Sequence, residues 1–329
     1  MTAGGALRAD DAIDVSVIVA AWKASAFIEK AIASALASTG VAVEIIAVDD
    51  ASPDDTFETL QRFAEADARI IALRLPSNGG PSAARNLAIQ NARGRYVAVL
   101  DADDAIAPTR LATLVTTADA ANADITVDNM TEVDEAGRPI SSTPFLKSAD
   151  FAAARDIDLT TWMRFNNPIS GGDALGYLKP LIRRSKLLET GIAYDTALRN
   201  SEDYYLVAHL LAAGARMTYT PSAGYFYTRS AGSTSHRLKP DQTRAWLDAE
   251  KRFALQHGAR LSPDERKAQA ERDRALRNVN QLIAIIETFK TRKFGAFASL
   301  TAADPRGAAY AFGVLSKVAV GKALRRKTV

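Results

Sequence analysis

Three acidic clusters are the residues of this chain best suited to chemistry: Asp49-Asp50, Asp101-Ala102-Asp103-Asp104 and Glu202-Asp203. The first two follow directly after apolar, β-branched runs. Carboxylates grouped in this way repel one another, so a cation is expected among them. Hard divalent cations take oxygen ligands from carboxylates and phosphates. The first two clusters therefore predict a divalent metal bound together with a diphosphate, and the third, roughly a hundred residues later, predicts a separate task.

The elements that position these clusters alternate between strands and helices. The apolar runs at residues 43–48 and 96–100 are predicted strands, as are residues 15–20 and 70–75. Helices are predicted between them at residues 25–38, from Ser52-Pro53, at 82–91 and from Pro108. Such alternation predicts parallel strands joined by right-handed crossovers. Ligands of open α/β sheets bind outside the carboxyl ends of the strands, where the first two clusters are expected.

The alternation weakens after about residue 122. Short strands are predicted at residues 125–130, 178–183, 217–220 and 224–228, with a helix at 202–213. From residue 241 the pattern is helical, and Ser262-Pro263-Asp264-Glu265 forms a capping box for a helix that ends near Lys290. The chain is therefore expected to be an α/β protein with a helical C-terminal region.

Composition excludes several classes of protein. The 329 residues are 47% apolar and 24% charged, as in a soluble globular protein. The absence of cysteine excludes disulfides and thiolate chemistry and suits a reducing compartment, so a cytoplasmic protein is expected. No signal peptide is predicted before Val15, and no run of eighteen apolar residues predicts a membrane span. A net charge of +3 is too small to indicate nucleic acid as a partner.

The order of the motifs resembles that of family 2 glycosyltransferases, inverting enzymes with the Rossmann-like GT-A fold, and in particular the bacterial exopolysaccharide enzymes of the succinoglycan type. The resemblance covers roughly residues 14–236. It rests on residues 15–21, Val48-Asp49-Asp50-Ala51-Ser52, residues 78–86 (NGGPSAARN), residues 94–104, residues 181–184, Glu202-Asp203, Tyr225-Phe226-Tyr227 and Gly232-Ser233.

The resemblance implies a metal-dependent transferase. Asp203 would be the general base, with Glu202 beside it as the second catalytic carboxylate. Asp103, with Asp101, would hold Mg²⁺ or Mn²⁺. The structural alternative for Glu202-Asp203 is a favourable first helical turn that Ser201 caps.

The resemblance also implies a nucleotide-sugar site. Asp50 would accept a hydrogen bond from the base, Arg85 would contact the nucleotide, and the loop with His236 and Arg237 would close over the diphosphate. The residues assigned to this site are Ala20, Asp49, Asp50, Arg85, Asp101, Ala102, His236 and Arg237. The alternatives are structural: aspartates that cap turns, a surface arginine and a surface loop.

The implied reaction moves one sugar from a nucleotide-diphosphate-sugar to an acceptor hydroxyl with inversion. The acceptor would be a glycan or lipid-linked, in exopolysaccharide or other cell-surface glycan assembly. One alternative is a nucleotidyltransferase acting on sugar phosphates, but the expected Gly-rich loop is absent from residues 20–25 (AAWKAS). The other is a degenerate, non-catalytic sugar-nucleotide-binding relative, which the intact acidic clusters oppose.

The expected organisation has three parts. Residues 1–13 form a flexible N-terminus. Residues 14–238 form the GT-A domain, divided into a nucleotide-sugar half (14–120) and an acceptor half (121–238). Residues 239–329 form a helical region whose tail, from residue 306, carries basic and apolar but no acidic side chains. Such a tail predicts peripheral contact with an anionic membrane on the cytoplasmic face of the inner membrane; the alternative is a packed terminal helix with a solvated basic end.

Overall fold

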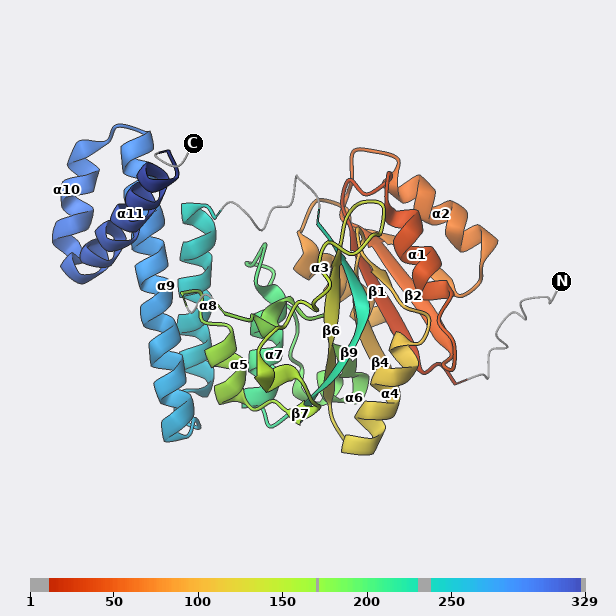
Figure 1. The fold of residues 1–329 in the computed structure, drawn as a ribbon. Coiled ribbons are helices and arrows are strands. Elements are labelled where there is room, and N and C mark those ends of the chain that lie inside the picture. The colour runs from red at the N-terminus through yellow and green to blue at the C-terminus, as the bar shows by residue number, and fades with distance from the viewer. Residues whose placement is uncertain (1–11, 170–171, 230–237, 327–329) are drawn as a thin grey trace. The chain divides into compact units, whose positions relative to one another are not determined.

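The computed structural model describes residues 12–169, 172–229 and 238–326 (Figure 1). These residues form two compact units. The first lies within Met1–Trp162 and Asp173–Ser233, and the second within Met163–Gly172 and Thr234–Val329.

Parallel strands form the first half of the sheet in the first unit. They are β1 (Val15–Ala21), β2 (Val43–Asp49), β3 (Ile70–Arg74) and β4 (Tyr96–Asp101), in the spatial order β3-β2-β1-β4. All seven residues of β2 are buried, which is typical of a parallel strand covered on both faces. The predicted α/β alternation is confirmed here.

Helices join these strands: α1 (Ile28–Leu36), α2 (Thr56–Ala66), α3 (Pro81–Asn91) and, after β4, α4 (Arg110–Ala121). On α1 the buried residues are Ile28, Ala31, Ile32 and Ala35, a spacing that places them on one helical face. The predicted start of α2 at Ser52 is wrong, because the Ser52 hydroxyl instead accepts a hydrogen bond from the Lys23 backbone N–H at 2.9 Å.

The sheet continues with mixed strand directions. Strand β8 (Leu181–Arg183) is antiparallel to both β4 and β6 (Ile125–Val133), and β9 (Met217–Thr228) runs parallel to β6. Two-residue strands, β5 (Ala105–Ile106) and β7 (Arg155–Asp156), pair with β9. The two strands predicted within 217–228 are one strand, whose pairing with β6 is irregular between Asp128 and Met130.

Short helices surround this half of the sheet: η1 (Ala149–Phe151), α5 (Leu159–Phe165), η2 (Leu175–Tyr177), α6 (Arg184–Thr190) and α7 (Glu202–Ala212). The sequence predicted only α7 among them. The indole N–H of Trp162 donates to the Tyr204 carbonyl at 3.1 Å, and their rings stack. This contact ties α5 to the first turn of α7.

The second unit contains α8 (Pro240–His257), α9 (Pro263–Lys290), α10 (Phe294–Ala303) and α11 (Pro305–Arg326) (Figure 1). Helix α9 contacts the other three, and Ile285 of α9 is buried with Ala308 and Ala311 of α11. The predicted capping box is confirmed: Ser262 Oγ accepts from Glu265 N at 3.3 Å, and Ser262 N donates to Glu265 Oε2 at 2.7 Å. Within the described ranges, none of the helices has the length and apolarity needed to cross a membrane.

Candidate active site

The site lies where the strand order reverses around β1. Strand β1 has β2 on one side and β4 on the other, so Ala20 pairs with Val48 and Asp101, and Ala21 pairs with Asp49. Ala20, Asp49 and Asp101 therefore share the carboxyl edge of the parallel strands. Such a switch point is the usual ligand site of an open α/β sheet.

Asp49 and Asp50 both hold backbone turns at this edge. Asp49 is fully buried, accepts from the Ser52 N–H at 3.1 Å and pairs with Arg74 at 3.1 Å. The carboxylate of Asp50 accepts from the N–H groups of Gly79 at 2.6 Å and Gly80 at 2.8 Å. The turn-holding alternative is thus present for both residues, and a base contact by Asp50 would use its remaining lone pairs.

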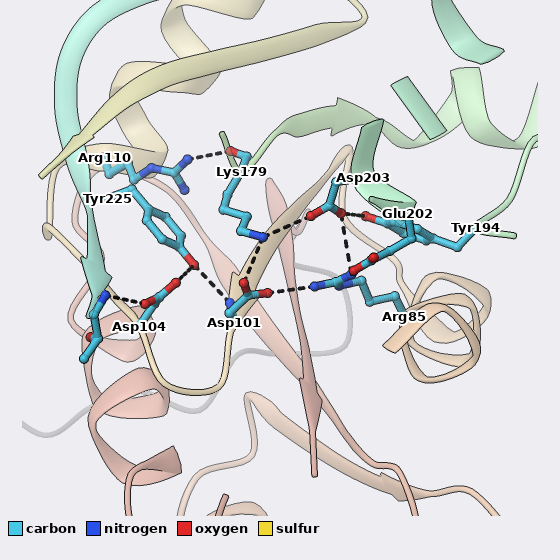
Figure 2. A network of polar contacts seen from close by, with 10 residues as sticks. Arg85, Asp101, Asp104, Arg110, Lys179, Tyr194, Glu202, Asp203 and Tyr225 are labelled. Atoms are coloured by element: carbon cyan, nitrogen blue, oxygen red, sulfur yellow. Dashed lines mark hydrogen bonds and ion pairs between the residues drawn. The ribbon is translucent and has the colours of Figure 1, made fainter. Parts of the chain in front are cut away.

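Arg85, on α3, contacts carboxylates of two acidic clusters (Figure 2). Its guanidinium pairs with Glu202 at 2.5 Å, with Asp101 at 2.7 Å and with Asp203 at 3.6 Å. The side chain is only 5% exposed, so Arg85 is not a surface arginine. It joins the second and third acidic clusters, which are a hundred residues apart in sequence.

Two residues that sequence reasoning missed complete this network, Lys179 and Tyr194 (Figure 2). The Lys179 ammonium lies 2.8 Å from Asp101 Oδ2 and 3.0 Å from Asp203 Oδ2. The Tyr194 hydroxyl donates to Asp203 Oδ1 at 3.0 Å. A single lysine beside an apolar run and a tyrosine in a loop give no signal in one sequence, because their partners are set by the fold.

The cations keep the buried carboxylates ionised. Burial raises the pKa of Asp101, but the charges of Lys179 and Arg85 outweigh it and the pKa of Asp101 falls below its usual range. Burial likewise opposes ionisation of Asp203, yet Arg85 and Lys179 lower the pKa of that carboxyl too. Both groups are therefore anionic at neutral pH.

Glu202 and Asp203 begin α7 and face the network. Ser201 has a φ of 61° and makes no side-chain cap, so the predicted capping role of Ser201 is wrong. Glu202 is 7% and Asp203 6% exposed. Arg85 contacts both carboxylates and Lys179 contacts Asp203, which a merely favourable first helical turn does not explain.

Asp103 and Asp104 lie in the same loop but differ in burial, because the side chain of Asp104 is buried and that of Asp103 is not. Asp104 Oδ1 accepts from the Thr228 N–H at 2.7 Å and Oδ2 from the Tyr225 hydroxyl at 2.6 Å. Burial, then the charges of Asp101 and Asp103, raise the pKa of Asp104 to about 8. Asp103 is exposed and has no salt bridge within the described ranges. Desolvation, and after it the Asp101 charge, raise the pKa of Asp103.

These properties fit a divalent cation held mainly through Asp103. Its carboxylate forms no salt bridge with any residue that the structure describes, whereas Asp101 Oδ1 and Oδ2 already pair with Arg85 and Lys179. Among the described residues no three His, Cys, Asp or Glu side chains form a ready metal cage. Mg²⁺ is commonly held by one or two carboxylates together with substrate phosphates, so the donor set of this loop suits a cation that arrives with a diphosphate.

The remaining candidates are Ala102, His236 and Arg237. Ala102 is 7% exposed in the turn that the Asp104 N–H closes on the Asp101 carbonyl at 3.1 Å. His236 and Arg237 lie outside the described residues.

The sequence of this chain is similar to those of known glycosyltransferases and glycan-biosynthesis proteins. The sequence model of glycosyl transferase family 2 matches residues 16–174. The succinoglycan biosynthesis protein ExoO of Rhizobium meliloti (strain 1021) is 37% identical over 296 residues, which are 90% of this chain and 83% of ExoO. The Escherichia coli WfaP protein, a UDP-Glc:alpha-D-GlcNAc-diphosphoundecaprenol beta-1,3-glucosyltransferase, is 28% identical over 67% of this chain and 79% of its own length.

Solved structures share the fold. Residues 1–349 of S. aureus TarS, in complex with UDP-GlcNAc, align over 90% of this chain and 92% of that segment, with a TM-score of 0.59 and 17% identity. The mannosyltransferase PcManGT from Pyrobaculum calidifontis, in complex with GDP-Man and Mn²⁺, aligns over 96% of this chain and 81% of its own with a TM-score of 0.59 and 18% identity. The predicted GT-A fold with C-terminal helices is confirmed.

Proposed function

The chain belongs to glycosyl transferase family 2 and is an inverting glycosyltransferase, and we infer its reaction from that family. We propose that it adds one sugar from a nucleotide-diphosphate-sugar to an acceptor hydroxyl during assembly of exopolysaccharide or another cell-surface glycan. The relation to ExoO supports this setting. A nucleotidyltransferase is not favoured by this family.

One observation carries the proposed chemistry: Arg85 and Lys179 join Asp101, at the end of β4, to Asp203, at the start of α7 (Figure 2). In an inverting transfer the acceptor oxygen attacks the anomeric carbon from the side opposite the leaving diphosphate. A base is therefore needed on the acceptor side of the donor site. Asp203, ionised and held in place, suits that task, with Glu202 beside it.

Residues at the strand edge would bind the donor. We propose that Asp50 accepts a hydrogen bond from the base, that Ala20, Asp49 and Ala102 shape the nucleotide pocket, and that Arg85, which pairs with Asp101, contacts the nucleotide. His236 and Arg237 would close on the diphosphate. In this proposal residues 14–120 bind the donor and residues 121–238 the acceptor, and residues 239–329 are an appended helical region.

Asp103, with Asp101 close by, would hold a divalent cation, Mg²⁺ or Mn²⁺. When bound, the cation would neutralise the charge that develops on the leaving diphosphate. The carboxylate of Asp103 is exposed and forms no salt bridge with another described residue, which supports this assignment. So does the charge of the buried network, where three carboxylates (Asp101, Glu202 and Asp203) face only two cations.

The acceptor is proposed to be a glycan or a lipid-linked sugar. The name of WfaP, which acts on a diphosphoundecaprenol-linked sugar, supports the lipid-linked form. Such an acceptor would be met at the cytoplasmic face of the inner membrane, with peripheral contact by the helical region. The basic tail is the part of this region predicted to make the contact. Its side chains from residue 317 onward lie outside the described ones.

A donor screen tests the function. The purified chain is incubated with UDP- and GDP-sugars, with Mg²⁺, Mn²⁺ or a chelator, and release of the nucleoside diphosphate is measured. Hydrolysis of one donor class that requires the metal is expected. Asp103→Asn should lose the metal-stimulated binding of the nucleoside diphosphate in calorimetry, whereas Asp156→Asn, at an exposed position of β7, should retain it.

Two results would contradict the proposal. Formation of a nucleotide-sugar from a nucleoside triphosphate and a sugar phosphate would establish a nucleotidyltransferase. The chain could also bind a nucleotide-sugar tightly but neither hydrolyse it nor transfer the sugar to any acceptor extracted from glycan-producing cells. That result would indicate the non-catalytic relative.

A further inference from the structure

Lys179 is a buried cation that joins the donor edge to Asp203. It lies between η2 and β8 and is 9% exposed. Its ammonium contacts two carboxylates from distant parts of the chain, Asp101 Oδ2 at 2.8 Å and Asp203 Oδ2 at 3.0 Å. A lysine is rarely buried unless it is paired, so these two contacts account for its position.

The backbone at Lys179 is also held by hydrogen bonds (Figure 2). Its carbonyl accepts from Arg110 Nη2 at 2.7 Å, and the same guanidinium pairs with the buried Asp128 at 2.8 Å. The next carbonyl, of Pro180, accepts from the Val99 N–H on β4 at 3.2 Å. The backbone beside Lys179 is thus fixed to β4, the strand that ends in Asp101.

We propose that Lys179 is the positioning residue for Asp203, holding this carboxylate at a set place relative to Asp101 and hence to the donor. The inference rests on the role of Asp203 as the base. Asp203 Oδ2 is held by Lys179 and Oδ1 by the Tyr194 hydroxyl at 3.0 Å. Two donors on different oxygens prevent rotation of the carboxylate, and its remaining lone pairs can accept the acceptor proton.

The same ammonium links both sides of the reaction. One lysine nitrogen contacts the carboxylate at the donor edge and the carboxylate proposed to activate the acceptor, so a shift of either one moves the other. Correct placement of a catalytic group matters because a displacement of about 1 Å can reduce the rate about a hundredfold.

A double-mutant cycle tests this role. The transfer rates of wild type, Lys179→Met, Asp203→Asn and the double variant are measured with the donor and acceptor that support turnover. Lys179→Met should lower kcat at least about tenfold, as loss of an orienting partner commonly does, with a smaller change in the donor KM. In the Asp203→Asn background the same substitution should have little further effect. Lys186→Met is the matched control, because Lys186 lies on α6 beside Asp124 and outside the network.

The outcomes separate the two proposals. Equal turnover of wild type and Asp203→Asn would reject Asp203 as the base and, with it, this role of Lys179. A large loss in Asp203→Asn with a full additional loss in the double variant would reject Lys179 alone. If Lys179→Met does not fold, as judged by its thermal transition, Lys179→Gln, which keeps a hydrogen-bond donor, takes its place in the same cycle.

Discussion

Individual charged residues at the centre of the first unit are buried with their partners. Arg85 contacts Asp101, Glu202 and Asp203, and Lys179 contacts two of the same carboxylates. A buried ion pair gains little over a well-packed apolar pair, but removing one partner leaves an uncompensated charge. Such a network is therefore explained better by function than by stability.

Removal of Arg85 should destabilise the protein. Arg85→Met leaves three carboxylates with Lys179 as their remaining cation in the network, so we expect a loss of about 3–5 kcal/mol in the free energy of unfolding. Urea denaturation followed by circular dichroism measures it. Arg138→Met, which breaks the exposed pair with Asp134, should change stability by about 0–1 kcal/mol. Equal effects of the two substitutions would show that the Arg85 network is not tightly paired.

Asp203→Asn should separate catalysis from binding. Asparagine keeps the shape, its carbonyl oxygen can accept from Lys179 and its NH2 group can donate to the Tyr194 hydroxyl, but it cannot take a proton. We expect nucleotide affinity and thermal stability close to those of the wild type, with turnover reduced at least about a hundredfold. Steady-state kinetics and calorimetry on one preparation measure both. Near-wild-type turnover would move the role of base to Glu202.

At the scale of elements, the start of α3 connects a turn to the site. Gly80 is the residue before Pro81 and has a φ of +85°, which favours glycine. Its N–H and that of Gly79 hold the Asp50 carboxylate, and α3 then carries Arg85 into the network. The glycines of this motif therefore place two candidate donor residues through one helix start.

Gly80→Ala should weaken nucleotide binding. A methyl group there requires a strained backbone and would lie 2.5 Å from Arg199 Nη1, so the turn and Asp50 should shift. We expect a loss of about 1–3 kcal/mol in stability and weaker nucleoside diphosphate binding in calorimetry. Gly214→Ala provides the control, because Gly214 has a φ of +84° with nothing near its added carbon. The same loss of nucleotide affinity in both variants would exclude a specific role of the Gly80 turn.

At the scale of the whole molecule, the helical unit presents an uncharged surface helix. Helix α10 (FGAFASLTAA) has no charged residue, and most of its described side chains are exposed. Phe297 on α10 contacts Phe289 and Phe312, which are 47% and 43% exposed. Exposed Lys290, Arg292 and Lys293 precede the helix. Apolar surface beside clustered cations suits the interface of an anionic membrane.

Loss of these three cations should weaken membrane binding. Each cation near an anionic surface contributes about 1 kcal/mol, so replacing Lys290, Arg292 and Lys293 with Gln should reduce co-sedimentation with phosphatidylglycerol vesicles more than about tenfold. The control replaces three other exposed cations of the unit, Lys251, Lys267 and Arg274. Equal binding by both triple variants and the wild type would remove this surface as the membrane contact.

The sequence by itself determined the fold class and the family. Apolar runs, helix periodicity and the Gly-Gly-Pro turn are local signals, and they predicted the strands β1 to β4 and the carboxylates that follow β2 and β4 at one edge. The Ser262 capping box was also readable, because all its partners lie within four residues.

The tertiary structure decided how the charges are paired. Arg85 and Glu202 are 117 residues apart, and Lys179 reaches Asp101 because the antiparallel strand β8 lies beside β4. Local rules placed Ser201 and Ser52 at helix starts as caps, but neither side chain caps a helix: Ser52 accepts from the distant Lys23 N–H instead, and Ser201 has a φ of 61°. The Ser262 capping box depends on neighbours in sequence, whereas the partner of a buried charge depends on which strands the sheet places side by side.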